Sequence, residues 1–153
     1  MTKNIRNKLL IIVFILLMIC GCNKDKSDAI KFKEEFESFN EQYEVLNIKE
    51  ENPFKYRTQS EIENLINNKE TFVVLYGKSD NNDTRNIIEP LIDSSNNNAL
   101  GTIYYVDSSD NIPLLIGYIK GEKYNETNSL DNINDIISKI SIELSTCNIE
   151  VGC

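Results

Sequence analysis

The chain has 153 residues, with 24 acidic side chains against 16 basic ones and no histidine, which gives a formal net charge of −8. An acidic surface repels phosphate groups, so we expect no nucleic-acid partner. Without histidine the chain has no Ser-His-Asp triad and lacks the commonest general base and metal ligand, and we predict neither a cofactor nor a metal site.

Residues 1–21 have the features of a signal peptide. Lys3, Arg6 and Lys8 form a positive start, and Leu9–Ile19 is an unbroken apolar run of eleven residues. As a helix this run is about 16 Å long, which is too short for a hydrocarbon core of about 30 Å. We therefore predict an export signal and exclude it from the folded domain.

The signal ends in Ile19-Cys20-Gly21-Cys22, which resembles a bacterial lipobox, where a small residue precedes the lipidated cysteine. Gly21 precedes Cys22, whereas the bulky Ile19 precedes Cys20, so Cys22 is the predicted lipidation site. The motif implies a mature chain acylated at Cys22, with palmitate among its fatty acids, anchored to membrane lipid at the extracytoplasmic face of a bacterial cell membrane. The alternative is an ordinary secretory signal with two incidental cysteines.

Residues 22–27 are predicted to be a polar tether, and residues 28–52 a helix followed by a connector. Apolar residues recur at spacings of three and four from the start of this segment, which predicts an amphipathic helix; they are Ala29, Phe32, Phe36, Phe39 and Tyr43. We expect this aromatic stripe to pack on its own domain, and a partner-binding face is the alternative.

Residues 53–145 are predicted to form one three-layer α/β/α domain, with a mixed central sheet of about four strands. Thr58 and Glu61 have the spacing of a capping box, which predicts a helix start at that point. Pro90 lies inside a helical pattern and should kink that helix. The predicted strands are 54–57, 71–77, 102–106, 114–120 and 123–125, and the predicted helices carry Ile62–Ile66, Ile87–Ile92 and Ile133–Leu144.

The predicted tail, residues 146–153, has no periodicity and contains both Cys147 and Cys153, which are six positions apart. In an oxidising exterior these two cysteines can form a disulfide that closes a small loop. A relocated redox pair and two free thiols are the alternatives.

Three segments together resemble thioredoxin: FVVLYG at 72–77, TIYYVD at 102–107, and Ile112-Pro113 followed by LLIGYIKGEK. Small exported thioredoxin-like proteins, including the bacteriocin-transport accessory type, are similar. The resemblance implies a thioredoxin-like fold. It also implies a cis bond before Pro113, with the preceding backbone beside the active loop and able to pair with an extended peptide. The alternative is that Pro113 only shapes the sheet.

In that family a strand similar to FVVLYG leads to Cys-x-x-Cys-Arg. Arg85 matches the arginine, which places Asn81 and Thr84 on the two cysteines, with Asn82 and Asp83 between them. Leu75 lies in the strand region where thioredoxin keeps a buried acid. An asparagine amide cannot attack a disulfide, and Thr84 has no evident base, so we expect no dithiol–disulfide exchange here.

The same loop, Asp80–Asp83, is rich in oxygen atoms but lacks the spacing of a calcium-binding loop. We expect Asn82 or Asp83 to cap the following helix.

The predicted protein is a membrane-anchored lipoprotein whose thioredoxin-like domain serves as a non-catalytic binding or accessory module. Asp80–Arg85 and Ile112-Pro113 would line the recognition surface for an extended peptide or an envelope protein. The alternative is an extracytoplasmic thiol–disulfide protein that works through Cys147 and Cys153.

Overall fold

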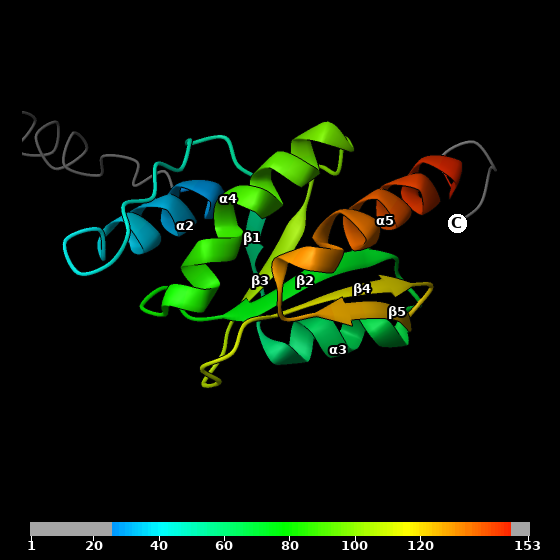
Figure 1. Ribbon diagram of the computed structural model, residues 1–153. Coiled ribbons are helices and arrows are strands. Elements are labelled where there is room, and N and C mark those ends of the chain that lie inside the picture. Colours follow the sequence, from blue (N-terminus) through cyan, green and yellow to red (C-terminus); the bar gives the residue numbers. More distant parts are fainter. Residues whose placement is uncertain (1–25, 148–153) are drawn as a thin grey trace, which may run out of the picture.

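The structure is a computed structural model that describes residues 26–147, so the predicted signal peptide, Cys20, Cys22 and Cys153 lie outside the described residues. Its elements, labelled in Figure 1, are α2 (Asp28–Glu37), β1 (Phe54–Tyr56), α3 (Gln59–Asn67), β2 (Phe72–Gly77), α4 (Asn82–Asn97), β3 (Ile103–Asp107), β4 (Leu114–Ile119), β5 (Glu122–Thr127), the 3-10 turn η1 (Leu130–Asn132) and α5 (Ile133–Cys147).

One mixed sheet runs through the molecule, with the strand order β1-β3-β2-β4-β5. The first three strands in this order are parallel, β4 pairs antiparallel with β2, and β5 pairs antiparallel with β4. This topology confirms the predicted α/β class with a thioredoxin-like fold. The sheet has five strands rather than about four, because β1 joins the sheet beside β3 and β5 pairs with β4 along its whole length.

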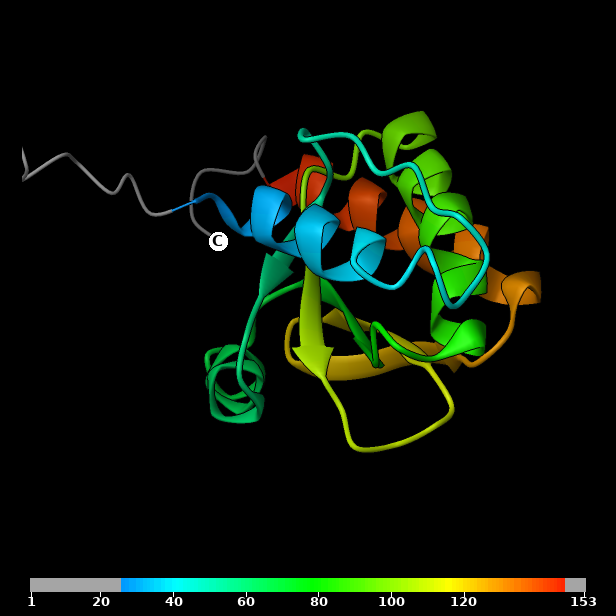
Figure 2. The same ribbon diagram turned by 90° about the vertical axis from the view of Figure 1, so that its left-hand side faces the viewer.

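Helices cover both faces of the sheet, with α3 on one face and α2, α4 and α5 on the other (Figures 1 and 2). The aromatic stripe of α2 packs on its own domain: the Phe32 ring stacks on Phe36 at 4.3 Å and on Phe54 at 4.0 Å between centroids, and all three are fully buried. The core on the α3 face is smaller and consists of Ile62, Phe72, Val74, Val106 and Ile116. Successive side chains of β2 point to opposite faces of the sheet, so this nearly continuous buried strand contributes to two separate apolar layers.

Two helix lengths differ from the prediction. α2 ends at Glu37, so Phe39 and Tyr43 lie in the turns that follow it. α4 continues past Pro90 to Asn97, five residues beyond the apolar pattern Ile87–Ile92 that predicted this helix. Ser94 is buried and its hydroxyl bonds the Asn134 side chain of α5 at 3.1 Å, so packing on α5 keeps the last turn helical.

The C-terminal helix α5 reaches Cys147, two residues beyond the predicted end of the domain. Across the part of the chain that the structure describes, none of the helices combines the length and the apolar character needed to cross a membrane.

Residues 38–52, here called the strap, connect α2 to β1 without a strand of their own. Polar side chains hold the strap in place. Asn40 donates to the Leu46 carbonyl at 2.9 Å and accepts from its amide at 3.0 Å. Glu37 accepts from the Ile48 amide at 3.0 Å, and Lys33 donates to the Ile48 carbonyl at 2.5 Å. The strap is thus a fixed part of the domain.

Candidate functional site

The candidate site, residues 78–85, is the loop between β2 and α4 together with the first turn of α4. It lies at the carboxyl ends of the parallel strands, where open α/β sheets usually bind their ligands. The loop between β3 and β4 approaches it from one side and the strap from the other, since Asn81 bonds Asn111 and Arg85 bonds Glu44. The structure therefore brings the two predicted halves of the recognition surface together.

Asn81 caps α4, where the sequence analysis expected Asn82 or Asp83. Its side-chain oxygen accepts from the Thr84 amide at 2.9 Å, which satisfies one of the free amides of the first turn. Its side-chain amide donates to the Asn111 carbonyl at 2.9 Å. Asn82 and Asp83 are exposed in the first turn. One side chain thus performs two tasks at a position that the resemblance assigns to a cysteine.

Thr84, at the other predicted cysteine position, is 1% exposed. Its hydroxyl accepts from the Lys78 amide at 3.2 Å and lies 3.3 Å from the side-chain oxygen of Asn81, to which it donates. A Cβ added to Gly77 would lie 2.6 Å from the Thr84 methyl carbon, so the two residues are closely packed. The Thr84 hydroxyl is hydrogen-bonded and buried, so Thr84 acts in packing and not as a nucleophile.

Two buried side chains, Leu75 and Tyr105, lie behind the loop on neighbouring strands. Leu75 is fully buried in β2. The neighbouring Tyr105 hydroxyl donates to the Gly77 carbonyl at 2.9 Å. Burial raises the pKa of the Tyr105 hydroxyl above its ordinary value, so it stays protonated.

Arg85, in the first turn of α4, makes structural contacts that its sequence match does not predict. Its side chain is 1% exposed, and its guanidinium donates to the carbonyls of Phe36 at 2.6 Å, Ser79 at 3.2 Å and Glu44 at 2.8 Å. It also donates to the Asn40 side chain at 2.7 Å. Arg85 thereby ties the end of α2 and the strap to the first turn of α4.

The charge of Arg85 has no acidic partner among residues 26–147, where no carboxylate lies within ion-pair distance of it. The Tyr43 ring lies 5.6 Å from the guanidinium carbon. Burial lowers the pKa of the guanidinium, but arginine remains charged in proteins. Its Nε is buried without a hydrogen-bond partner in the described chain.

The Ile112–Pro113 peptide bond is trans, as are all peptide bonds of the described residues, so the cis bond implied by the resemblance is wrong. The trans form is favoured by about 0.5–1 kcal/mol. The Ile112 side chain is 61% exposed, so it gains no burial energy that could offset the preference for the trans bond. The loop keeps an exposed apolar side chain beside Asn81, but not the backbone geometry expected before a cis-proline.

Cys147, one member of the predicted cysteine pair, ends a helix that is distant from this loop. α5 ends at Cys147, and its last turns lie far from the start of α4 in both ribbon views (Figures 1 and 2). The Ser141 hydroxyl donates to the Asn98 carbonyl, which follows the opposite end of α4. Cys153 lies outside the described residues. Within the described range, no three His, Cys, Asp or Glu side chains converge as a metal site would require.

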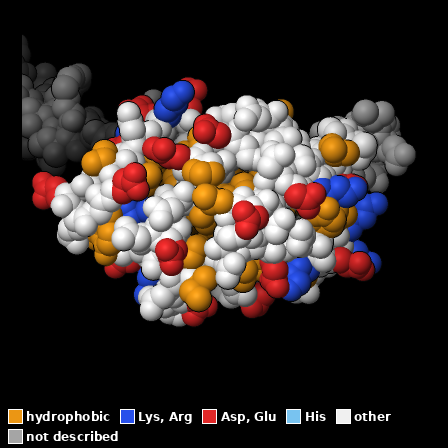
Figure 3. Space-filling model, viewed as in Figure 1, with side chains coloured by type: hydrophobic (Ala, Val, Ile, Leu, Met, Phe, Trp, Pro, Cys, Tyr) orange, Lys and Arg blue, Asp and Glu red, His pale blue; other side chains and the backbone are white. Residues whose placement is uncertain are grey.

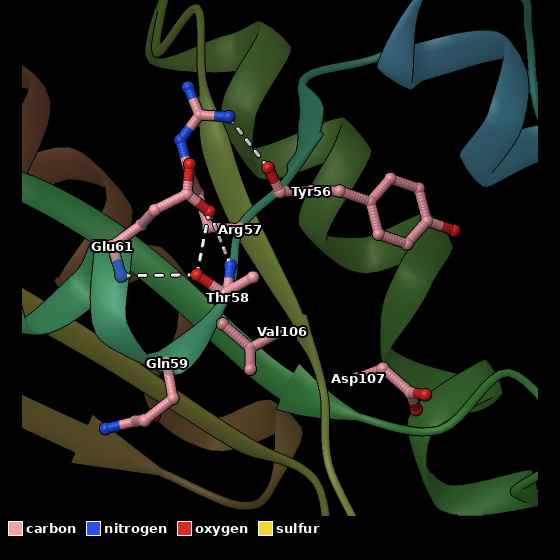
Figure 4. Close-up of a pocket in the computed structure, with 7 residues that line it drawn as sticks. All are labelled: Tyr56, Arg57, Thr58, Gln59, Glu61, Val106 and Asp107. Carbon is pink, nitrogen blue, oxygen red and sulfur yellow. Dashed lines mark hydrogen bonds between the residues drawn. The ribbon is translucent and has the colours of Figure 1, made fainter.

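A second hollow, of about 460 Å³, lies at the carboxyl ends of β1 and β3 (Figure 4). Glu61 faces this hollow, but its carboxylate accepts from the Thr58 amide at 2.8 Å and from its hydroxyl at 3.0 Å, which confirms the predicted capping box. These bonds lower the pKa of Glu61. Arg57 donates to the Tyr56 carbonyl at 2.8 Å. Of the three charged side chains that line this hollow, Glu61 and Arg57 are thus already engaged, which makes the hollow the weaker candidate.

No protein-family model matches the chain, and no curated protein matches it either. A solved structure of Plasmodium falciparum thioredoxin is similar to it, with 15% identity, a TM-score of 0.45, and coverage of 56% of this chain and 97% of that chain. The assignment of the thioredoxin-like fold rests on the strand order and strand directions described above.

Replacing Arg85 with methionine should detach the strap. The change keeps an apolar stem but leaves the carbonyls of Phe36, Ser79 and Glu44 without their donor, and we expect the free energy of unfolding to fall by about 3 kcal/mol. Hydrogen exchange should accelerate across residues 38–48 before other regions. Arg57→Met is the matched control, since Arg57 also lies over a tyrosine ring but is about one-third exposed. Unchanged exchange in the strap would show that apolar packing alone holds it.

Substitutions at Asn81 should separate its two tasks. Asn81→Ala removes the cap and should lower the free energy of unfolding by about 1 kcal/mol. Asn81→Asp keeps the acceptor and adds a favourable charge at the helix start, so it should cost less. Both variants lose the donor to Asn111, so hydrogen exchange should accelerate in residues 107–112 in both. Asn82→Ala is the control, and an equal loss of stability there would contradict the assignment of the cap.

Proposed function

We propose that this protein is a lipid-anchored, extracytoplasmic binding or accessory protein in which a thioredoxin-like scaffold carries no dithiol chemistry. The proposal rests on the side chains at the two positions that the resemblance assigns to cysteines. Asn81 is a helix cap joined to the neighbouring loop, and Thr84 is a buried packing residue. Neither can form the thiolate that attacks a disulfide.

The binding role is supported by what remains at the carboxyl end of the sheet. Asp80–Arg85 and Ile112 lie beside each other through the bond between Asn81 and Asn111, and the Ile112 side chain is largely exposed. An apolar side chain next to exposed polar groups suits contact with an extended peptide or an envelope protein. The surface is rigid, because the cap and Arg85 hold the loop.

The anchoring role is supported by the lipobox resemblance at Ile19–Cys22 and by the short polar segment that follows. Acylation would hold the domain at the outer face of a bacterial membrane, since each buried CH₂ group contributes about 0.8 kcal/mol. The acidic surface, with 24 acidic residues in the chain, would not be attracted to anionic headgroups, so the lipid would provide the attachment.

Thiol assays test the absence of redox chemistry. In insulin reduction with dithiothreitol, the protein should leave the rate unchanged, and Cys147→Ser and Cys153→Ser variants should behave identically. A thioredoxin assayed in parallel provides the positive control. Protein-dependent reduction that disappears in Cys147→Ser would overturn the proposal and support the thiol–disulfide alternative.

Labelling with a palmitate analogue tests the anchor. When the full chain is produced in a bacterial host, Cys22→Ala should abolish the label and release the protein from the membrane fraction. Cys20→Ala should keep both, because Ile19 is too bulky for the small-residue position before a lipidated cysteine. Retention of the label in Cys22→Ala would show that the lipobox assignment is wrong.

A further inference from the structure

A groove runs along the seam between the strap and α4. It consists of three adjoining hollows of about 230, 160 and 390 Å³. Glu89 lines both the first and the second hollow, and Glu51 and Asn96 line both the second and the third, so the three form one continuous depression. The groove begins at Arg85, near the candidate site, and ends at Ser27, just before α2.

The walls of this groove are acidic. Five carboxylates line it, against Lys49 and the buried Arg85; they are Glu44, Glu50, Glu51, Glu89 and Asp93. None of the five forms an ion pair with another residue of the described chain. Figure 3 shows acidic and hydrophobic side chains close together over the part of the surface where α2 and α4 lie. The groove therefore has unpaired negative charge available for a ligand.

The Arg85 end of the groove adds apolar and hydrogen-bonding character. Leu46 and Pro90 line it, and Val45 at its edge is 68% exposed. The Nε of Arg85 is a buried donor without an acceptor among the described residues, and Arg85 lines the same hollow. A backbone carbonyl of a bound chain would satisfy this donor after a shift of the side chains that cover it.

We propose that the groove binds an extended, lysine- or arginine-rich segment of a partner protein. This inference rests on the proposed binding role and adds a second surface and the chemistry of its ligand. The α4 residues that line the groove run from Arg85 to Asn96, a rise of about 17 Å, which matches about five residues of extended chain. Alternate side chains of an extended segment point the same way, so basic residues at every second position can face the carboxylates.

Fluorescence anisotropy with a labelled twelve-residue peptide of alternating lysine and alanine tests this inference on the mature chain in neutral detergent. The peptide should bind, and binding should weaken as salt is added, because the charges are exposed. A peptide of alternating glutamate and alanine should not bind. The triple variant Glu44→Gln/Glu89→Gln/Asp93→Asn should raise the Kd for the lysine peptide roughly tenfold.

The matched control is Glu70→Gln/Glu122→Gln/Asp131→Asn, which removes the same charge from exposed positions away from the groove. An equal rise in Kd for this control variant would show that the peptide is attracted to net charge alone, and it would overturn the inference. Absence of peptide binding to the natural chain would also overturn it. Circular dichroism checks that both variants remain folded.

The lipobox resemblance implies removal of residues 1–21, so Lys3, Arg6 and Lys8 would be absent from the mature chain used in these measurements. Failure of any of these peptide tests leaves the proposed absence of redox chemistry standing, because the thiol assays test that separately.

Discussion

The hydrogen bonds of one buried guanidinium connect the segment before the sheet to the helix that follows β2. Arg85 donates to the backbone of α2, to the strap and to the loop of the candidate site, and no carboxylate within residues 26–147 pairs with its charge. Burying such a charge is costly unless hydrogen bonds satisfy it, so the surrounding carbonyls must stay in place. The groove and the rigid loop both depend on this arrangement.

The candidate site combines a thioredoxin-like strand, loop and helix with a sequence, residues 78–85, that contains no sulfur atom. A reactive dithiol needs an accessible thiolate at a helix start. Here the helix start is satisfied by the Asn81 cap, and the next position facing inward, Thr84, fills the space against Gly77. The polar groups that would otherwise face a substrate are bonded to one another. What remains for recognition is the shape of the surface and its exposed side chains.

Much of this fold can be predicted from local patterns. The buried run FVVLYG, the capping box at Thr58 and Glu61, and the isoleucine spacing of α5 all correspond to elements of the structure. The partners of Arg85 could not be predicted, because Phe36 and Asn40 lie 49 and 45 residues away in the sequence. The length of α4 was also missed, since contacts with α5 extend it. The cis bond at Pro113 was inferred from a resemblance, and no local pattern supports it.

The packing of Thr84 under Gly77 also bears on what a cysteine pair in this loop would require. A sulfur at position 84 would have to fit the space that Thr84 fills against Gly77, where the side chain is 1% exposed. A sulfur at position 81 would remove both the helix cap and the hydrogen bond to Asn111. A stable dithiol at this helix start would therefore need a new cap and a new hold on the neighbouring loop, in addition to the two cysteines.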